Sequence, residues 1–212
     1  MSLVNCRPGY WLLSAVVMAG MSTHLSAATT GYVMNVQMVP AICSLYPETA
    51  KKRKCLEGYS LNITGLFPED NPANCTTASS AKLSPLQAKV VARVMPDDNS
   101  RTLLWQTIGG CIPMNASQYF RTIINYADRL KVPHELTDQE SIVMSVDTLR
   151  TKFLKINPQL PAQGIRFNCQ STGHSSLLVG IKVCYRSNGQ YKQCPAHIVN
   201  SCPGTVTIKG TY

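Results

Sequence analysis

The order of its predicted elements places this chain in the α+β class. Strands are predicted up to about residue 67, helices between about residues 85 and 154, and strands again from about residue 165 onward. Separate runs of strands and helices are typical of α+β domains, whereas alternating runs would indicate an α/β fold. An even number of cysteines beyond an amino-terminal leader adds a second prediction, a chain crosslinked by disulfides.

Two strands are expected near the start of the mature chain. Residues 31–39 alternate loosely between apolar and polar side chains, and residues 59–67 do so more regularly. Such alternation is typical of strands that bury one face. The polar, turn-rich residues 70–80 are predicted to form a loop that carries Cys75.

Three helices are predicted over about residues 85–95, 116–130 and 138–154. The first has Ser84 as its N-cap, followed by a proline that fits the first helical position. Apolar side chains recur at helical spacing along all three. They are Leu86, Val90 and Val94, then Tyr119, Phe120, Ile123, Ile124 and Ala127, then Ile142, Val146, Leu149 and Phe153.

Strands return at about residues 165–169, 177–185, 190–194 and 205–209. Ser187-Asn188-Gly189 separates the second from the third of these strands. It is a hairpin signal, because Asn-Gly readily adopts the positive φ angles of tight turns.

Residues 1–28 have the features of a secretory signal peptide, which leaves residues 29–212 as one domain. Arg7 precedes a mostly apolar run, and Ser26-Ala27-Ala28 supplies the small residues of a cleavage site. A membrane anchor is the alternative, but the apolar run is shorter than the roughly 20 residues that span a bilayer. We therefore expect a secreted or periplasmic protein with no stable membrane insertion.

Cleavage after Ala28 removes Cys6 and leaves eight of the nine cysteines. An even count in a secreted chain favours four disulfides, although spacing alone does not decide how eight cysteines pair. A zinc site is the alternative, but no Cys-x-x-Cys or His-x-x-x-His pair is present to build one. We predict no metal and no other cofactor.

The chain carries a formal net charge of +9, which suits polyanionic partners such as RNA. Lys51, Lys52, Arg53 and Lys54 form the one pronounced basic run. They are candidates for contacts to phosphate groups. The alternative is that the run is only the solvated tip of a loop.

Two cysteine-flanked segments carry the strongest functional information. One is Leu61-Asn62-Ile63-Thr64-Gly65-Leu66-Phe67-Pro68, which precedes Cys75, and the other is Leu104-Trp105-Gln106-Thr107-Ile108-Gly109-Gly110-Cys111. Together they resemble the two active-site segments of the ribonuclease T2 family, HGLWP and E-W-x-K-H-G-x-C. The glycines, Pro68, Trp105 and Cys111 fall in register with those motifs.

The resemblance extends over nearly the whole mature chain. It implies a ribonuclease T2-like fold, in which an antiparallel sheet packs against helices. It also implies how the cysteines pair. The shared set would be Cys75–Cys111, Cys169–Cys202 and Cys184–Cys194, with Cys43–Cys55 left as a local clip.

The reacting groups of the family are missing from this frame. Thr64 and Ile108 stand where the family has two histidines, Leu104 where it has a glutamate and Thr107 where it has a lysine. Metal-free RNA cleavage needs a base, an acid and groups that steady charge on phosphorus. Neither threonine nor isoleucine titrates near neutral pH. We therefore predict no catalytic residue at these four positions.

The remaining candidates are weaker. Phe67 and Trp105 could stack on a base or belong to the core; we favour the core for Trp105 and weigh both roles equally for Phe67. Outside the leader, His134, His174 and His197 lie in neither motif, so we expect ordinary surface histidines.

The leading hypothesis is a secreted protein of the ribonuclease T2 family that has lost its catalytic groups and binds RNA or another polyanion. One alternative is an active but slow or non-standard endoribonuclease. The other is an envelope or extracellular module that binds a protein partner on the same fold.

Overall fold

The computed structural model describes residues 30–70, 72–173 and 175–211. The predicted signal peptide therefore lies outside the described residues. Within those three ranges, no helix is both long and apolar enough to cross a membrane.

Strands and helices occur together, as the α+β class requires. The strands are β1 (Gly31–Met38), β2 (Leu61–Pro68), β3 (Ile142–Ser145), β4 (Ile165–Ser171), β5 (Ser176–Arg186) and β6 (Thr205–Ile208). The α-helices are α1 (Val39–Leu45), α2 (Arg53–Leu56), α3 (Pro85–Ala92), α4 (Asp98–Ile108), α5 (Ala116–Arg129) and α6 (Val146–Ile156).

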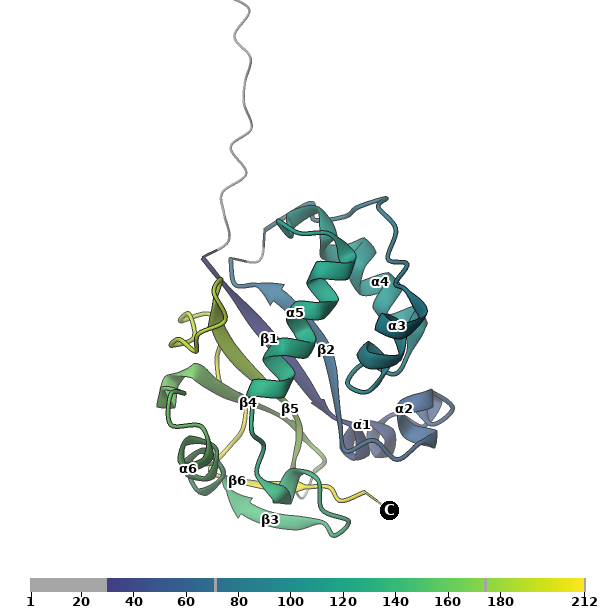
Figure 1. The fold of residues 1–212 in the computed structure, drawn as a ribbon. Helices are drawn as coiled ribbons and strands as arrows, with labels where there is room; N and C mark the ends of the chain where they lie inside the picture. The colour runs from purple at the N-terminus through teal and green to yellow at the C-terminus, as the bar shows by residue number, and fades with distance from the viewer. Residues whose placement is uncertain (1–29, 71, 174, 212) are drawn as a thin grey trace, which may run out of the picture.

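The strands form one sheet in the order β2-β1-β5-β6-β3, and β4 also pairs with β5. The pairs β1–β2, β1–β5, β4–β5 and β3–β6 are antiparallel, and β5 meets β6 in parallel at Leu177 and Thr207. Figure 1 shows α5 lying along one face of the sheet, with α3 and α4 beside it. The predicted fold class is confirmed.

The main core lies between the sheet and α5. Alternate residues of β1 from Tyr32 to Met38 are buried on this face, because strand side chains alternate between faces. A capping box starts α5, in which the side chains of Asn115 and Gln118 each accept a hydrogen bond from the other's backbone N–H. The apolar stripe of α5 is fully buried through Tyr119, Phe120 and Ile123.

Four disulfides crosslink the fold. They join Cys43 to Cys55, Cys75 to Cys111, Cys169 to Cys202 and Cys184 to Cys194. These are the pairs that the family resemblance implies. All eight sulfurs are bonded in pairs, so none is available as a thiolate ligand for a metal ion. Among the described residues, no three His, Cys, Asp or Glu side chains are grouped so that they could hold a metal ion.

The third predicted helix, over residues 138–154, is wrong at its start. Residues 142–145 form β3, which pairs with β6, and α6 begins only at Val146. The β-branched pair Ile142 and Val143 favours a strand, and both side chains are exposed rather than buried. Ser145 then caps α6 by accepting a hydrogen bond from the Thr148 N–H at 3.0 Å.

Two further expectations need correction. Residues 190–194 were expected to be a strand, but they contribute only an isolated bridge between Tyr185 and Tyr191. The first predicted helix, α3, ends at Ala92, and Leu86 on its predicted apolar face is exposed. Helix α4 was not predicted at all, because its sequence is largely polar and a charged residue, Arg101, occupies one of its four buried positions.

A buried carboxylate, that of Glu69, links the end of β2 both to Lys192 after β5 and to Thr30 at the start of the described chain. Glu69 is almost fully buried, and the Lys192 ammonium donates to its two carboxylate oxygens at 2.8 and 2.7 Å. The Thr30 hydroxyl donates to the same carboxylate. Burial alone would raise the pKa of Glu69, but these hydrogen bonds outweigh it and the pKa lies below its usual value.

This ion pair predicts an acid-sensitive contribution to stability. A carboxyl with a lowered folded-state pKa stabilises the fold above its unfolded pKa of about 4.3, and the contribution is lost as pH falls through the folded value. Glu69→Gln should therefore lower stability near neutral pH and flatten the loss of melting temperature below about pH 4. Glu48→Gln, at an exposed glutamate, is the control. An unchanged acid dependence in Glu69→Gln would contradict this role for the pair.

Candidate functional site

The two motif segments lie against each other in the fold. The first forms β2, the edge strand of the sheet, and the second forms the last turns of α4. Gly65 marks their closest approach, since a Cβ placed there would lie 2.7 Å from the Phe67 ring and 2.9 Å from Leu104 Cδ1. The structure therefore brings Gly65, Phe67 and Leu104 together.

Thr64 occupies an irregular position in β2. Asn35 of β1 pairs with Gly65, and the next residue, Val36, pairs with Ile63, so Thr64 is the extra residue of a β-bulge. Its hydroxyl lies 3.4 Å from the Asn35 carbonyl oxygen. A bulge changes the direction in which a side chain points. The side chain at this bulge is a threonine, whose hydroxyl cannot act as an acid or base near neutral pH.

The facing side of α4 is apolar. Leu104 and Ile108 are one helical turn apart and share a face, and both are buried in the main core. Thr107 lies on the exposed side, where its hydroxyl donates to the Leu103 carbonyl of its own helix at 2.8 Å. None of the three positions presents a titratable group or a cation to Thr64.

Trp105 is a core residue. It is only 2% exposed, its ring packs 5.6 Å from the Tyr119 ring, and its indole N–H donates to Ser79 Oγ at 2.9 Å. Gly109 is needed beside it, because a Cβ there would lie 2.8 Å from the indole. Phe67, by contrast, is half-buried, so part of its ring remains open to a ligand.

The Cys75–Cys111 disulfide ties the loop after β2 to the end of α4. Beside it, the Gly110 N–H donates to the Cys75 carbonyl at 2.8 Å and the Thr77 N–H donates to the Gln106 carbonyl at 2.9 Å. A Cβ on Gly110 would lie 2.6 Å from the Thr76 carbonyl oxygen. The motif glycines and cysteines therefore hold the frame, whatever side chains stand at the reacting positions.

The basic run lies in the loop that Cys43–Cys55 closes. Lys51, Lys52 and Arg53 are exposed, and the Arg53 guanidinium donates to Glu57 at 2.5 Å. Lys52 and Arg53 face residues 96–100 at the start of α4, across a hollow of about 450 Å³. The run is thus close to the amino-terminal end of the helix that carries Leu104.

Lys54 differs from its three neighbours. Its side chain is buried, and its ammonium donates to Gln37 Oε1, which Asn62 Nδ2 also approaches at 3.4 Å. Burial lowers the pKa of Lys54. The expectation that the whole run is an exposed loop tip is therefore wrong for Lys54, which helps to anchor the loop to β1.

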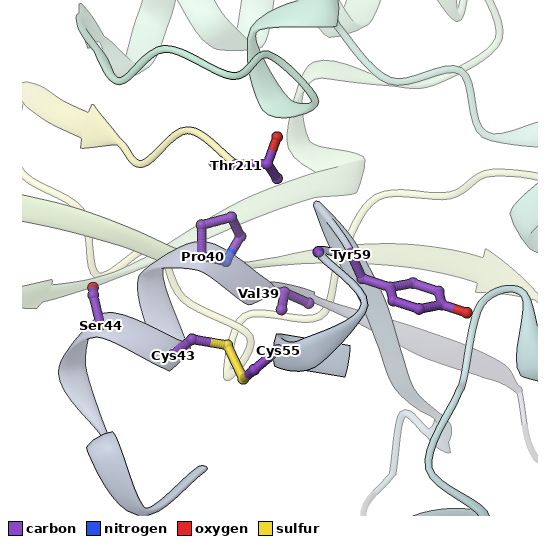
Figure 2. Close-up of a pocket in the computed structure, with 8 residues that line it drawn as sticks. Val39, Pro40, Cys43, Ser44, Cys55, Tyr59 and Thr211 are labelled. Atoms are coloured by element: carbon purple, nitrogen blue, oxygen red, sulfur yellow. A yellow bond between two sulfur atoms is a disulfide. The ribbon is translucent and has the colours of Figure 1, made fainter. Parts of the chain in front are cut away.

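The clip itself borders a small hollow of about 180 Å³. Figure 2 shows the Cys43–Cys55 disulfide near Val39 and Pro40, with the Tyr59 ring directed away from it. The Tyr59 hydroxyl donates to the Ala92 carbonyl at 3.2 Å. The residues around this hollow are mostly apolar, and apart from the two cysteines of the clip it contains none of the predicted site residues.

A polar face of the sheet was missed in the sequence. Asn35 lies opposite Lys182 of β5, and Lys182 lies opposite Arg166 of β4, so these three side chains share the face away from the main core. No aspartate or glutamate occurs in β1, β2, β4 or β5. The polar residues that alternate with buried methionine and valine in β1 could have revealed one strand of this face, but not its partners.

The histidines do not join the site among the described residues. His134 is exposed, and its Nδ1 lies 3.3 Å from the Glu135 carboxylate. His197 is exposed in the loop before β6. His174 lies outside the described residues.

The burial of Lys54 predicts unequal effects within the basic run. Lys54→Ala should lower the free energy of unfolding by about 1–2 kcal/mol, because it removes packed methylene groups and the hydrogen bond to Gln37. Lys51→Ala, at an exposed position, should change it by less than about 0.5 kcal/mol. Urea denaturation of both variants makes the comparison, and equal effects would contradict the anchoring role.

No protein-family model matches this chain, and no curated protein matches it. Solved structures do. Ribonuclease MC1 from bitter gourd seeds has a TM-score of 0.64 at 15% identity, over 83% of this chain and 98% of its own. The self-incompatibility-associated SF11-RNase of Nicotiana alata has a TM-score of 0.63 at 15% identity, over 85% and 99%.

An RNase-related protein from Calystegia sepium has a TM-score of 0.63 at 16% identity, over 84% of this chain and 96% of its own. Variants of ribonuclease MC1 have been solved in complex with 5′-UMP and with 5′-GMP. Sequence identities this low establish the architecture alone. The chain has the fold of the T2-type ribonucleases.

Proposed function

We propose that this chain is a secreted, catalytically degenerate protein of the ribonuclease T2 family that binds RNA or another polyanion. The observation that carries the proposal is the packing of α4 against β2. Leu104 and Ile108 are buried apolar side chains at the two α4 positions where the family motif has a glutamate and a histidine. Thr64, at the other histidine position, offers only a hydroxyl near a backbone carbonyl.

The loss of these groups removes acid–base catalysis. Each general acid or base contributes roughly 10²–10⁴-fold to an enzymatic rate. Thr107 is uncharged, so it brings no cation to a phosphate. Its hydroxyl is bonded to its own helix. The frame without its reacting groups favours binding over turnover.

Charge and an open aromatic ring support a polyanion as the ligand. Lys182 lies on a sheet face whose strands β1, β2, β4 and β5 contain no carboxylate, beside Arg166, whose guanidinium already donates to the Ile165 and Ile198 carbonyls. Lys51, Lys52 and Arg53 are exposed in the loop that Cys43–Cys55 closes, although Arg53 is paired with Glu57 and the hollow beside Lys52 also contains Asp97 and Asp98. Cations of this kind contact phosphates, and a half-buried ring such as Phe67 can stack on a base.

Four disulfides support a location outside the reducing cytosol. Structural disulfides form and persist in secretory and periplasmic compartments. Together with the signal peptide predicted for residues 1–28, they favour a secreted or periplasmic protein.

A cleavage assay tests the loss of catalysis. The purified, oxidised protein should cleave single-stranded RNA no faster than about 10⁻⁴ of the rate of an active T2-type ribonuclease. Thr64→Ala is the control for a contaminating nuclease, whose activity it would leave unchanged. Turnover within about tenfold of the active enzyme that Thr64→Ala reduces would show that the chain is an enzyme.

A binding assay tests whether the chain binds a polyanion. We expect micromolar or weaker affinity for single-stranded RNA that falls with salt, because phosphate contacts release counterions. Replacing Lys51, Lys52 and Arg53 by serine should reduce the slope of log K against log salt by about two, at about 0.7 per contact. Lys89→Ser and Arg129→Ser, at exposed cations elsewhere, are the matched controls. No salt-sensitive binding at low ionic strength would contradict the proposal.

A further inference from the structure

We propose that the seam between α3 and α5 is a docking groove for an acidic, amphipathic segment of a protein partner. This surface lies outside the β2–α4 site, and the inference does not depend on RNA binding. It rests on three observations, namely an apolar hollow between the two helices, an exposed leucine at its rim, and cations that outnumber the one carboxylate of α5, Asp128.

The two helices are joined side by side at one end. Gln87 Nε2 donates to the Ser117 carbonyl at 2.6 Å, and Ser117 Oγ donates to Gln87 Oε1 at 2.8 Å. Next to this pair lies a hollow of about 440 Å³ whose apolar walls come from Leu86, Val90 and Ile124. The polar groups of the wall are thus already bonded to each other, which leaves an apolar surface for a partner.

A second hollow of about 220 Å³ lies farther along α5, where Ala127 and Leu130 face Val94 after α3 and residues of β1 and β2 such as Leu61. From Ser117 to Leu130 the seam follows α5 for about 20 Å, at about 1.5 Å per residue. That length suits roughly three to four turns of a helix laid in the groove, a common mode of peptide recognition.

Leu86 projects from the rim of this groove and is 75% exposed. It was expected on the apolar face of α3, yet among the described residues no apolar surface covers it. A single exposed leucine is common on protein surfaces, but beside an apolar hollow it adds to a continuous apolar patch that a partner can cover. A partner side chain in the hollow would bury both surfaces together.

The charges around the groove indicate which kind of partner would fit it. No aspartate or glutamate occurs between Asp70 and Asp97, whereas that segment contains Lys82, Lys89 and Arg93. Lys82 and Arg121 border the first hollow, and Arg93 borders the second. Cations at both ends of an apolar seam complement a segment that has aliphatic side chains on one face and carboxylates beside them.

The apolar seam favours a peptide over a nucleic acid. RNA would place phosphates and bases against a surface, and the groove offers aliphatic walls and no aromatic ring for stacking. The same cations would still attract RNA if the groove were a nucleic-acid site. The experiment therefore measures both ligands on the same variants.

The probe is a fluorescent 14-residue helical peptide with leucines at i, i+3, i+4 and i+7 and glutamates on either side. A peptide of the same composition, with its leucines spread around the helix, is the control. Fluorescence anisotropy should show at least about tenfold tighter binding of the first peptide by the wild-type protein. Leu86→Asp should weaken that binding by about tenfold or more, and Arg121→Glu should weaken it and reduce its salt dependence.

Leu103→Asp is the matched variant. Leu103 is 65% exposed on α4 and does not border the groove, so this change should leave peptide binding intact. Circular dichroism checks that each variant is folded; both leucines are exposed, so both changes should be tolerated. Leu86→Asp should also leave RNA affinity unchanged.

Three outcomes would overturn the docking groove. The first is equal affinity for the two peptides. The second is equal loss in Leu86→Asp and Leu103→Asp. The third is a loss of RNA affinity in Leu86→Asp, which would make the seam a nucleic-acid surface. None of these results would bear on the absence of catalysis at the β2–α4 site.

Discussion

The hydroxyl of Tyr119 is the contact on which the geometry of the site depends. It accepts a hydrogen bond from the Leu66 N–H at 3.0 Å and donates one to the Leu66 carbonyl at 3.1 Å. An edge strand has unpaired backbone groups, and this buried tyrosine satisfies two of them at the middle of the first motif. Its ring also packs against Trp105 of α4. One side chain of α5 thereby fixes β2 and α4 relative to each other.

The residues that fix the geometry of the site are therefore different from those that would carry its chemistry. Gly65, Gly109 and Gly110 are required by close approaches, and Cys75–Cys111 closes the loop between the two segments. None of these features depends on a titratable group. The reacting positions can therefore be filled by apolar side chains, which gain stability from burial at roughly 25 cal/mol per Å². Leu104 and Ile108 are such side chains, and both belong to the main core.

Elements with a regular apolar pattern could be predicted from the sequence. Strand β1 and helix α5 have such patterns, and α5 adds the Asn115 capping box. Helix α4 could not be predicted because the charged Arg101 occupies one of its inward positions and the apolar Leu103 lies on its exposed side, which obscures the apolar pattern. The bulge at Thr64 and the burial of Lys54 depend on partners in β1, which local sequence does not reveal. The site residues were therefore identified by their resemblance to a family motif. Their burial could be seen only in the three-dimensional structure.

The stability of Leu104→Glu tests the central claim most directly, with Thr107→Lys as its partner. Each change introduces the charge that the ribonuclease T2 motif has at that position. If the α4 face is packed against β2, Leu104→Glu should lower the free energy of unfolding by at least about 3 kcal/mol, because it buries an unpaired carboxylate. Thr107→Lys, at an exposed position, should change it by less than about 0.5 kcal/mol. A Leu104→Glu variant as stable as the wild type would mean that the position opens into a hydrated cleft, and would contradict the account.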